Sequence, residues 1–311
     1  MSVSPFHYIP LSEQAGTRIP EANILCLGNF DGVHLAHRTL LREAKRMQQK
    51  LLPHAKCGVF CFDPPSSDFL FPQPPRHLCL GEEKAERFRS EGMDFALFAD
   101  FSKLCELEPE AFVNEILIKH CHCVGIVCGF NYRFGKGGRG TPQMMQALFE
   151  GPLFVQSEIT LDVKTVSSSE IRKLIAEGRM EDANRLLTIP YSFTSPVLHG
   201  KTLGRKLGAP TINQHMPHGM QIPRLGVYLT ECEIDGVRYT GVSNIGKRPT
   251  VDCTEEIVCE TFVLDFSGDL YGKSIKTSFL RFLRPEQRFE GQDELQQQIA
   301  SDIKEAQKYQ R

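Results

Sequence analysis

The stretch that most constrains this fold runs from residue 24 to residue 44. It begins with a short apolar run at residues 24–27, breaks at the sequence Gly-Asn-Phe-Asp-Gly of residues 28–32, and continues into a helical pattern. A strand, a tight turn and a helix in this order direct backbone N–H groups and a helix N-terminus at an anion. The stretch therefore predicts a phosphate-binding turn at the end of a buried strand.

The alternation of strands and helices continues through the first half of the chain. Apolar runs that predict strands lie at residues 57–62, 95–98, 124–128 and 154–159, and helical patterns lie at residues 82–90, 109–119 and 181–187. Strands and helices that alternate in units of roughly 30 residues favour a parallel, doubly wound α/β sheet.

The second half of the chain has a different character. Residues 226–234 and 237–245 flank Asp235-Gly236, which is a strong signal for a two-residue hairpin. Further strand patterns lie at residues 257–266 and 274–282, and the chain ends in a helical pattern with an apolar stripe. Several short strands and one terminal helix predict a small antiparallel β-barrel domain with a C-terminal helix.

A segment without periodicity separates the two halves. Residues 188–196 contain two prolines and show neither a helical nor a strand pattern, so we expect a linker there. We therefore expect one domain at residues 1–187 and a second at residues 197–311, a division that the length of 311 residues allows.

Composition narrows the class of function. A net charge of −2 provides no long-range attraction for nucleic acid or for an acidic membrane. Residues 1–20 lack the apolar core of a signal peptide, and no apolar run is long enough to span a bilayer. The eleven cysteines are irregularly spaced, which favours reduced thiols. We expect a cytoplasmic protein that binds neither nucleic acid nor membrane, and the oligomeric state stays open.

Two histidines follow the predicted turn. His34 and His37 are spaced so that both imidazoles lie on one face of the helix. Phosphate contact is the favoured interpretation, because two imidazoles beside such a turn can stabilise charge on a phosphoryl group during its transfer. Metal binding would need a third ligand that the neighbouring sequence does not supply. A surface pair without function is the remaining alternative.

Other patterns resemble known motifs only in part. Residues 135–140 match the dinucleotide fingerprint Gly-x-Gly-x-x-Gly, but residues 130–134 separate them from the preceding strand. A mobile, cationic loop over an anionic ligand is the better interpretation, with a plain flexible loop as the alternative. Gly200-Lys201-Thr202 and Gly272-Lys273-Ser274 lack the first glycine of a P-loop. For His120-Cys121-His122-Cys123, a polar turn beside a buried strand is preferred over a metal site.

A second candidate phosphate site lies in the second half. Residues 199–213 combine glycines, cations and short hydroxyl and amide side chains. This set suits phosphate and Mg²⁺, because the oxygens of Thr and Asn are hard donors; a turn-rich barrel loop is the alternative. Glu260 is a lone carboxylate in a β-rich run, where it either faces solvent on an alternating strand or serves as a general base.

Taken together, these motifs resemble those of the bacterial bifunctional riboflavin kinase/FAD synthetase (FMN adenylyltransferase) family over nearly the whole chain. The adenylyltransferase motifs lie at residues 28–37, 129–135 and 167–172, and the kinase motifs lie at residues 204–213, 226–228, 244–250, 260 and 269–272. The chain departs from the usual family pattern at a few positions, among them Ala36 and Asn131.

The resemblance implies a doubly wound, nucleotidyltransferase-type α/β domain followed by a kinase barrel, with two ATP-dependent reactions. In the second domain the ribityl 5′-hydroxyl of riboflavin attacks the γ-phosphate of ATP to give FMN, and the catalytic residue Glu260 would deprotonate or orient this hydroxyl. In the first domain the phosphate of FMN attacks the α-phosphate of ATP, which releases pyrophosphate and gives FAD. His34 and His37 would stabilise charge on the group that is transferred.

The resemblance also implies which residues bind the ligands. ATP-binding residues of the adenylyltransferase are Gly28, Asn29, Phe30, Asp31, His34, His37, Ser168, Ser169 and Arg172, and its FMN-binding loop contributes Asn131, Arg133 and Phe134. ATP-binding residues of the kinase are Gly200, Lys201, Gly204, Arg205, Thr211 and Asn213. Thr211 and Asn213 would also hold Mg²⁺. The implied partners are riboflavin, FMN and ATP, with FMN and FAD as products.

Three alternatives stay open at the level of sequence. The first is a riboflavin kinase whose adenylyltransferase domain is weakened or inactive, which would follow from the departures at Ala36 and Asn131. The second is a dinucleotide-dependent oxidoreductase that uses residues 135–140. The third is a flavin- or nucleotide-binding regulator without turnover.

Overall fold

A computed structural model describes the chain at residues 7–10, 19–198, 211–249 and 255–309. By its internal contacts the chain divides into two compact units. The first unit comprises residues 1–75 and 80–167, and the second comprises residues 76–79 and 168–311. Each unit has its own main sheet and its own hydrophobic core.

The first unit is built on a six-stranded sheet in which all strands run parallel, in the order β1-β4-β3-β2-β5-β6. The strands are β1 (His7–Pro10), β2 (Asn23–Leu27), β3 (Lys56–Phe62), β4 (Phe95–Ala99), β5 (Cys123–Gly129) and β6 (Leu153–Gln156). The strand order reverses between β2 and β5. This is the switch point of a doubly wound sheet, beside which ligands bind at the carboxyl ends of the strands. The predicted α/β fold is confirmed.

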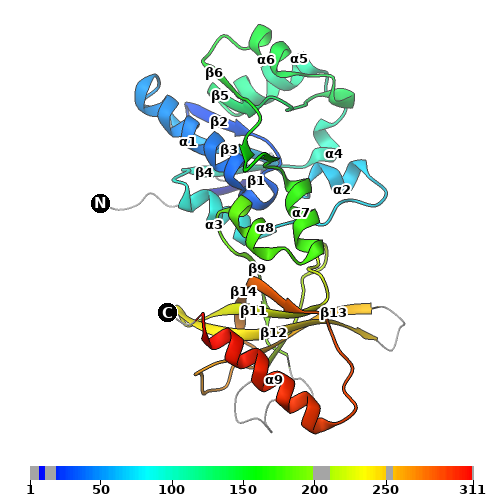
Figure 1. The fold of residues 1–311 in the computed structure, drawn as a ribbon. Helices are drawn as coiled ribbons and strands as arrows, with labels where there is room; N and C mark the ends of the chain where they lie inside the picture. The colour runs from blue at the N-terminus through cyan, green and yellow to red at the C-terminus, as the bar shows by residue number, and fades with distance from the viewer. Residues whose placement is uncertain (1–6, 11–18, 199–210, 250–254, 310–311) are drawn as a thin grey trace. The chain divides into compact units, whose positions relative to one another are not determined.

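Helical segments connect these strands and flank the sheet (Figure 1). They are η1 (Asp31–Val33), α1 (Leu35–Lys50), α2 (Ser66–Leu70), α3 (Gly81–Ser90), α4 (Phe101–Leu104), α5 (Pro109–Ala111), η2 (Phe112–His120), η3 (Lys136–Gly138) and α6 (Pro142–Leu148). A two-stranded hairpin, β7 (Thr160–Leu161) and β8 (Lys164–Thr165), follows β6. Helix α6 begins at a Thr141 cap, whose hydroxyl accepts a hydrogen bond from the backbone N–H of Met144 at 3.3 Å.

The packing of β2 shows that both faces of this sheet are covered. Leu25 and Leu27 point to one face, where they share a core with Leu117 of η2. Cys26 points to the other face, where its Sγ lies 3.8 Å from the carbonyl oxygen of Leu40 in α1. Burial on both faces explains why the strands of this unit read as continuous apolar runs.

The second unit contains a six-stranded antiparallel sheet in the order β10-β13-β12-β11-β14-β9. Its strands are β9 (Tyr191–Pro196), β10 (Thr211–His215), β11 (Gly226–Ile234), β12 (Val237–Pro249), β13 (Glu255–Val263) and β14 (Ser274–Arg284). The two edge strands approach each other at a bridge in which the N–H of Leu198 donates to the carbonyl of Asn213 at 2.8 Å. The sheet therefore curls into a partly closed barrel, as predicted.

The predicted hairpin and terminal helix of this unit are also confirmed. Asp235 and Gly236, with φ angles of 49° and 79°, connect β11 to β12 in the left-handed conformation that such a turn requires. Helix α9 (Gln292–Gln307), red in Figure 1, lies across one face of the barrel. There Ala306 and Ile303 pack in the same core as Leu229.

Two segments differ from the sequence-based expectation. Residues 191–196, which we expected within a linker, form strand β9 beside β14. The two prolines do not interrupt this strand, because Pro190 precedes it and Pro196 is its last residue. Residues 211–213, for which a turn-rich loop was the alternative, belong to strand β10.

Two helices that lie within the expected first domain, residues 1–187, belong by their contacts to the second unit. They are α7 (Ser168–Glu177) and α8 (Met180–Leu187). The side chain of Asn184 in α8 donates to the carbonyl of Phe279 and accepts from the N–H of Tyr191, each at 2.8 Å. An amide that bridges β14 and β9 in this way anchors the helix to the barrel.

The cysteines are reduced throughout the described chain, and all but Cys105 of those described are buried. Burial raises the pKa of Cys57 to about 11 and that of Cys128 to about 12. Because the thiolate is the reactive form, we expect iodoacetamide to modify Cys105 at least about tenfold faster than Cys57 or Cys128 in the native protein. Peptide mass spectrometry measures these rates, with urea-unfolded protein as the control. Similar native rates at the three sites would contradict the burial.

Candidate functional sites

The turn after β2 leaves the sheet at the switch point. Leu27 and Cys128 are paired in the register of β2 and β5, so the turn after β2 and the loop after β5 begin at adjacent positions. Within the turn, Phe30, Gly32 and Val33 have φ angles of 50°, 80° and 42°. A β-branched residue at positive φ is strained, and strain of this kind is retained mainly at functional sites.

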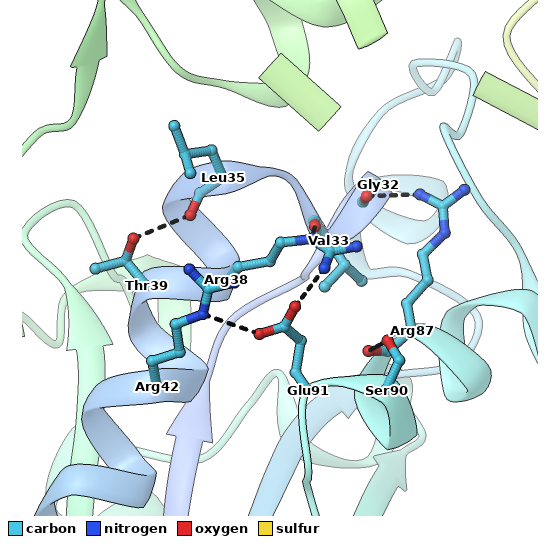
Figure 2. Close-up of polar contacts among 9 residues, drawn as sticks. All are labelled: Gly32, Val33, Leu35, Arg38, Thr39, Arg42, Arg87, Ser90 and Glu91. Atoms are coloured by element: carbon cyan, nitrogen blue, oxygen red, sulfur yellow. Dashed lines mark hydrogen bonds and ion pairs between the residues drawn. The ribbon is translucent and has the colours of Figure 1, made fainter. Parts of the chain in front are cut away.

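Two arginines hold this turn (Figure 2). Arg87 of α3 donates to the carbonyl oxygen of Gly32 at 2.6 Å, and Arg38 of α1 donates to the carbonyl oxygen of Val33 at 3.2 Å. Glu91 beside the end of α3 in turn pairs with Arg38. These bonds from neighbouring elements fix the conformation of the turn.

His34 and His37 stack on each other where α1 begins. Their ring centroids are 3.6 Å apart and their planes differ by 14°. His34 is also the N-cap of the helix, and its Nδ1 accepts a hydrogen bond from the backbone N–H of His37 at 3.4 Å. The structure thus brings together the two imidazoles that the sequence predicted to share one face.

The surroundings of His37 keep its imidazole neutral. Burial lowers the pKa of His37 well below its ordinary value, and the charges of His34 and Lys84 lower it further. The Nδ1 atom of His37 is buried and has no hydrogen-bond partner among the residues that the structure describes. A neutral imidazole donates through only one of its nitrogens, so His37 offers a ligand one N–H.

The other predicted residues of this turn take different positions. Phe30 is fully buried, and its ring packs between those of His37 and Phe88, at 5.0 and 5.6 Å. Phe30 therefore supports His37 rather than facing a ligand. Asn29 is exposed, with its Oδ1 3.3 Å from the hydroxyl of Ser66. Gly28 and Asp31 are half-buried.

The loop after β5 presents two of its three predicted residues to solvent. Asn131 and Arg133 are exposed, whereas Phe134 is buried in the core against Phe112.

In the second unit, Ser168, Ser169 and Arg172 lie in the first turns of α7, where Arg172 donates to the Ser169 hydroxyl at 3.3 Å.

The glycine-rich segment 135–140 differs both from a dinucleotide-binding turn and from the expected cationic loop. It does not open a helix directly after a strand, because β5 ends at Gly129 and α6 begins only at Pro142. Its cations are already engaged, since Lys136 pairs with Glu106 and Arg139 pairs with Glu108. The expected cationic loop is thus neutralised by acidic neighbours in its own unit.

Among residues 7–10, 19–198, 211–249 and 255–309, no group of three or more His, Cys, Asp or Glu side chains is placed to hold a metal ion. In that part of the chain, His34 and His37 therefore have no third ligand of these types. Cys121 and Cys123 are buried, and the Cys123 thiol lies 3.2 Å from the carbonyl oxygen of Gly125.

No helix of the described chain is both long and apolar enough to cross a bilayer.

The second candidate site is a row of polar side chains across three strands of the barrel. Glu260 on β13 is paired in register with Asn213 on β10 and with Asn244 on β12. Directly paired residues point to the same face, with Cβ atoms about 5 Å apart. Thr211 lies on that face too, because it is two residues before Asn213. The register thus brings together the predicted residues Thr211, Asn213 and Glu260.

Two charged residues complete this row. The carboxylate of Glu260 is half-exposed and accepts a hydrogen bond from Arg248 at 2.8 Å. Asn244 donates to Glu286 at 3.3 Å. Sequence reasoning gave Arg248 and Asn244 no role of their own and missed Glu286, because the contacts depend on register and on the path of the chain after β14. The predicted residues Gly200, Lys201, Gly204 and Arg205 lie outside the described residues.

A parallel α/β unit with a histidine pair at its switch point, followed by a β-barrel with a row of polar side chains, is the arrangement of a two-domain transferase. A family model described as FAD synthetase matches residues 17–170, and a model described as riboflavin kinase matches residues 187–310. A "bifunctional riboflavin kinase/FMN adenylyltransferase" of Listeria monocytogenes is 34% identical over 285 residues, which cover 90% of each chain. The chain belongs to the bifunctional riboflavin kinase/FMN adenylyltransferase family.

Other known proteins are similar over nearly the whole length. A relative of the same name from Bacillus subtilis is 32% identical over 310 residues, which cover 97% of this chain and 95% of that protein. A crystal structure described as a macrolide-efflux protein of Streptococcus pneumoniae matches with a TM-score of 0.89 and 28% identity, over 97% of this chain and 99% of the other. The protein is thus an ATP-using transferase with a riboflavin kinase and an FMN adenylyltransferase domain, and the enzyme names imply riboflavin, FMN and ATP as substrates.

Replacing Arg87 tests the importance of the strained turn. We expect Arg87→Ala to lower the rate of FAD synthesis from FMN by about tenfold or more, because loss of its bond to Gly32 lets the turn relax. FMN synthesis from riboflavin is expected to stay unchanged. Arg89→Ala, an exposed arginine on the same helix, is the control. Equal FAD synthesis by the two variants, measured by chromatography, would contradict this role.

Proposed function

We propose that the two reactions take place at two separate sites, adenylyl transfer at the histidine pair and riboflavin phosphorylation at Glu260. The observation that carries the proposal is that the two histidines lie in the first unit and the residues around Glu260 lie in the second. The stacked imidazoles lie at the switch point of the parallel sheet. The row of Asn213, Glu260 and Asn244 lies on the barrel.

In the kinase reaction, Glu260 accepts the proton of the ribityl 5′-hydroxyl as that oxygen attacks the γ-phosphorus of ATP. The new P–O bond forms as the bond to the β-phosphate oxygen breaks, which gives FMN and ADP. Arg248 holds the carboxylate of Glu260 in place by the 2.8 Å hydrogen bond.

The residues of this row also fit Mg²⁺. The side chain of Asn213 is buried and has no hydrogen-bond partner among the residues described, and Thr211 supplies a hydroxyl on the same face. Hard oxygen donors of this kind, together with phosphate oxygens, are the usual ligands of Mg²⁺. When bound, Mg²⁺ would neutralise charge on the phosphates of ATP.

In the adenylyltransferase reaction, a phosphate oxygen of FMN attacks the α-phosphorus of ATP and pyrophosphate leaves. His34 and His37 donate hydrogen bonds to the oxygens of the transferred group, and no covalent intermediate with the enzyme is needed. Asn29 and the backbone of residues 28–31 bind the triphosphate.

The flavin of FMN binds near the loop after β5 in this proposal. Asn131 and Arg133 are exposed there and suit a phosphate or a flavin edge. Phe69 and Phe71 are exposed just beyond the carboxyl end of β3, at the same edge of the sheet. An exposed apolar surface of this kind suits a flat aromatic ring.

The proposal extends to the organisation of the chain. We assign adenylyl transfer to residues 1–187 and riboflavin phosphorylation to residues 197–311. We further propose that the enzyme acts in the cytoplasm on small molecules, without a nucleic-acid or membrane partner, because its net charge of −2 gives no general attraction for either.

One incubation tests the proposed function. The purified protein is mixed with riboflavin, ATP and Mg²⁺, and the products are separated by chromatography. We expect FMN first and FAD later, and neither product when the metal is removed with EDTA. FMN without FAD would contradict the adenylyltransferase half and favour the kinase-only alternative. No product at all would contradict both halves and favour a regulator.

A further inference from the structure

Lys84 is a buried cation of the first unit without a counter-charge. It lies in the first turn of α3 and its residue surface is 6% exposed. Within the described part of the chain it forms no hydrogen bond and no ion pair. A lysine is almost never fully buried unless it is paired, because removing its charge from water is costly. The stem of Lys84 is therefore buried while its ammonium group keeps contact with solvent, and no acid of the described chain binds that group.

The position of Lys84 on its helix adds to this cost. A positive charge in the first turn of a helix is disfavoured by the helix dipole, and the neighbouring Glu82 and Glu83 are the residues that this position favours. Glu83 does not neutralise Lys84, because its carboxylate is paired with Arg87. A buried lysine at a helix N-terminus with no acid bound to it is unfavourable for folding alone.

Lys84 lies on the face of α3 that packs against the turn after β2. Arg87 and Phe88, which follow Lys84 by three and four positions, share this face of the helix. Arg87 binds the carbonyl oxygen of Gly32, and Phe88 packs at a right angle against Phe30, which contacts His37. Lys84 is close enough to His37 for its charge to lower the pKa of that imidazole.

Two polar groups without a hydrogen-bond partner in the described chain thus lie near the switch point. One is the ammonium group of Lys84 and the other is the buried Nδ1 of His37. We propose that Lys84 binds the phosphates of ATP in the adenylyltransferase site and neutralises charge on the departing pyrophosphate. As the FMN oxygen bonds to the α-phosphorus, the bond from that phosphorus to the β-phosphate oxygen breaks, and the negative charge moves toward Lys84. This inference rests on the proposed function of the histidine site.

The first test compares charge-changing variants in both activities. Lys84→Met removes the charge and keeps the apolar stem, and we expect it to lower kcat for FAD synthesis from FMN by about 100-fold or more. Lys84→Arg keeps the charge and is expected to recover FAD synthesis to within about tenfold of the wild type. FMN synthesis from riboflavin should be unchanged in both. Lys119→Met, at an exposed lysine of the same unit, is the control and should leave both activities unchanged.

The second test separates phosphate binding from a packing role. Lys84→Met should not lower the Tm of the ligand-free protein, because no ion pair is lost and the apolar stem is kept. Pyrophosphate should raise the Tm of the wild type by linkage and should have less effect on Lys84→Met. In an NMR titration, the pKa of His37 should rise in Lys84→Met, because a neighbouring positive charge is gone.

The outcomes distinguish this inference from the function on which it rests. If the wild type makes no FAD from FMN and ATP, the proposed function of the site is wrong. If the wild type makes FAD and Lys84→Met makes it within about threefold of that rate, the role of Lys84 is wrong. The inference is also overturned if pyrophosphate raises the Tm of Lys84→Met as much as that of the wild type. Lys84→Gln repeats the comparison if the methionine variant does not fold.

Discussion

Replacing Glu260 with glutamine is expected to abolish the formation of FMN from riboflavin and ATP. The amide keeps the shape of the side chain and its place between Asn213 and Asn244 but cannot accept the hydroxyl proton. Loss of a general base lowers the rate by about 10²–10⁴-fold. Steady-state kinetics with riboflavin measure this loss, which is expected in kcat rather than in the KM for ATP.

The other reaction of the same enzyme provides the internal control. FAD synthesis from supplied FMN is expected to survive in Glu260→Gln, because the histidine pair belongs to the other unit. Glu256→Gln is the matched variant on the same strand, where Glu256 pairs with His215 at 3.5 Å rather than with Arg248. Equal loss of both activities in Glu260→Gln would show that the two reactions do not use separate sites.

The variant should fold normally. Glu260 and Arg248 are both half-exposed, and an ion pair of this kind contributes about 1 kcal/mol or less to stability. The Tm of Glu260→Gln is therefore expected to change by only a few degrees, about 2–4 °C at most for a domain of this size. A loss of kinase activity without a fall in Tm separates the chemical role of Glu260 from a structural one.

The inner strands of the parallel sheet could be predicted from sequence because burial on both faces leaves a continuous apolar run. β2, β3, β4 and β5 all have this pattern and were all found. The turn chemistry was equally informative at Asp235-Gly236, where the two-residue hairpin is confirmed. Local sequence is sufficient to predict the structure where a residue pattern is compatible with only one local conformation.

The strands that the sequence did not predict are edge strands. In the two six-stranded sheets, β1, β9 and β10 each lie at an edge, and the fourth edge strand, β6, ends earlier than predicted. An edge strand has one neighbour instead of two and tolerates proline and polar residues. An edge strand forms largely because the neighbouring strand offers it hydrogen-bonding groups, so its own sequence shows only a weak strand pattern. This explains why residues 191–196 resembled a linker.

The candidate sites show the same division between local and long-range information. The spacing of His34 and His37 predicted their shared face, because both lie in one helix turn. The contact of Arg248 with Glu260 depends on the register of β12 and β13, which sequence alone does not specify. Lys84 follows two glutamates and looks like part of a solvated helix face. Only the packing of α3 on the turn after β2 shows that it is buried.

The double substitution His34→Ala with His37→Ala is expected to abolish FAD synthesis from FMN and to leave riboflavin phosphorylation unchanged. Each imidazole is proposed to donate a hydrogen bond to the transferred group, and removing one such donor costs about 10²–10³ in kcat. Part of any loss at His34 comes from its role as helix N-cap, which contributes about 1 kcal/mol to stability. His37→Gln, which leaves that cap intact, isolates the catalytic contribution.

The pH dependence shows which form of His37 acts. Because the pKa of His37 is lowered well below 6.5, the imidazole is already neutral at pH 6.5, and its N–H donates in that form. The rate of FAD synthesis should therefore not fall because of His37 as the pH rises from about 6.5 to 8. A cationic His37 of ordinary pKa would instead lose its proton, and with it activity, across the same interval. A decline that disappears in His37→Gln would contradict the neutral form. His54→Ala, which changes an exposed histidine of the same unit, is the control. If the variant that carries both His34→Ala and His37→Ala makes FAD at the wild-type rate, the proposed role of the histidine pair is excluded.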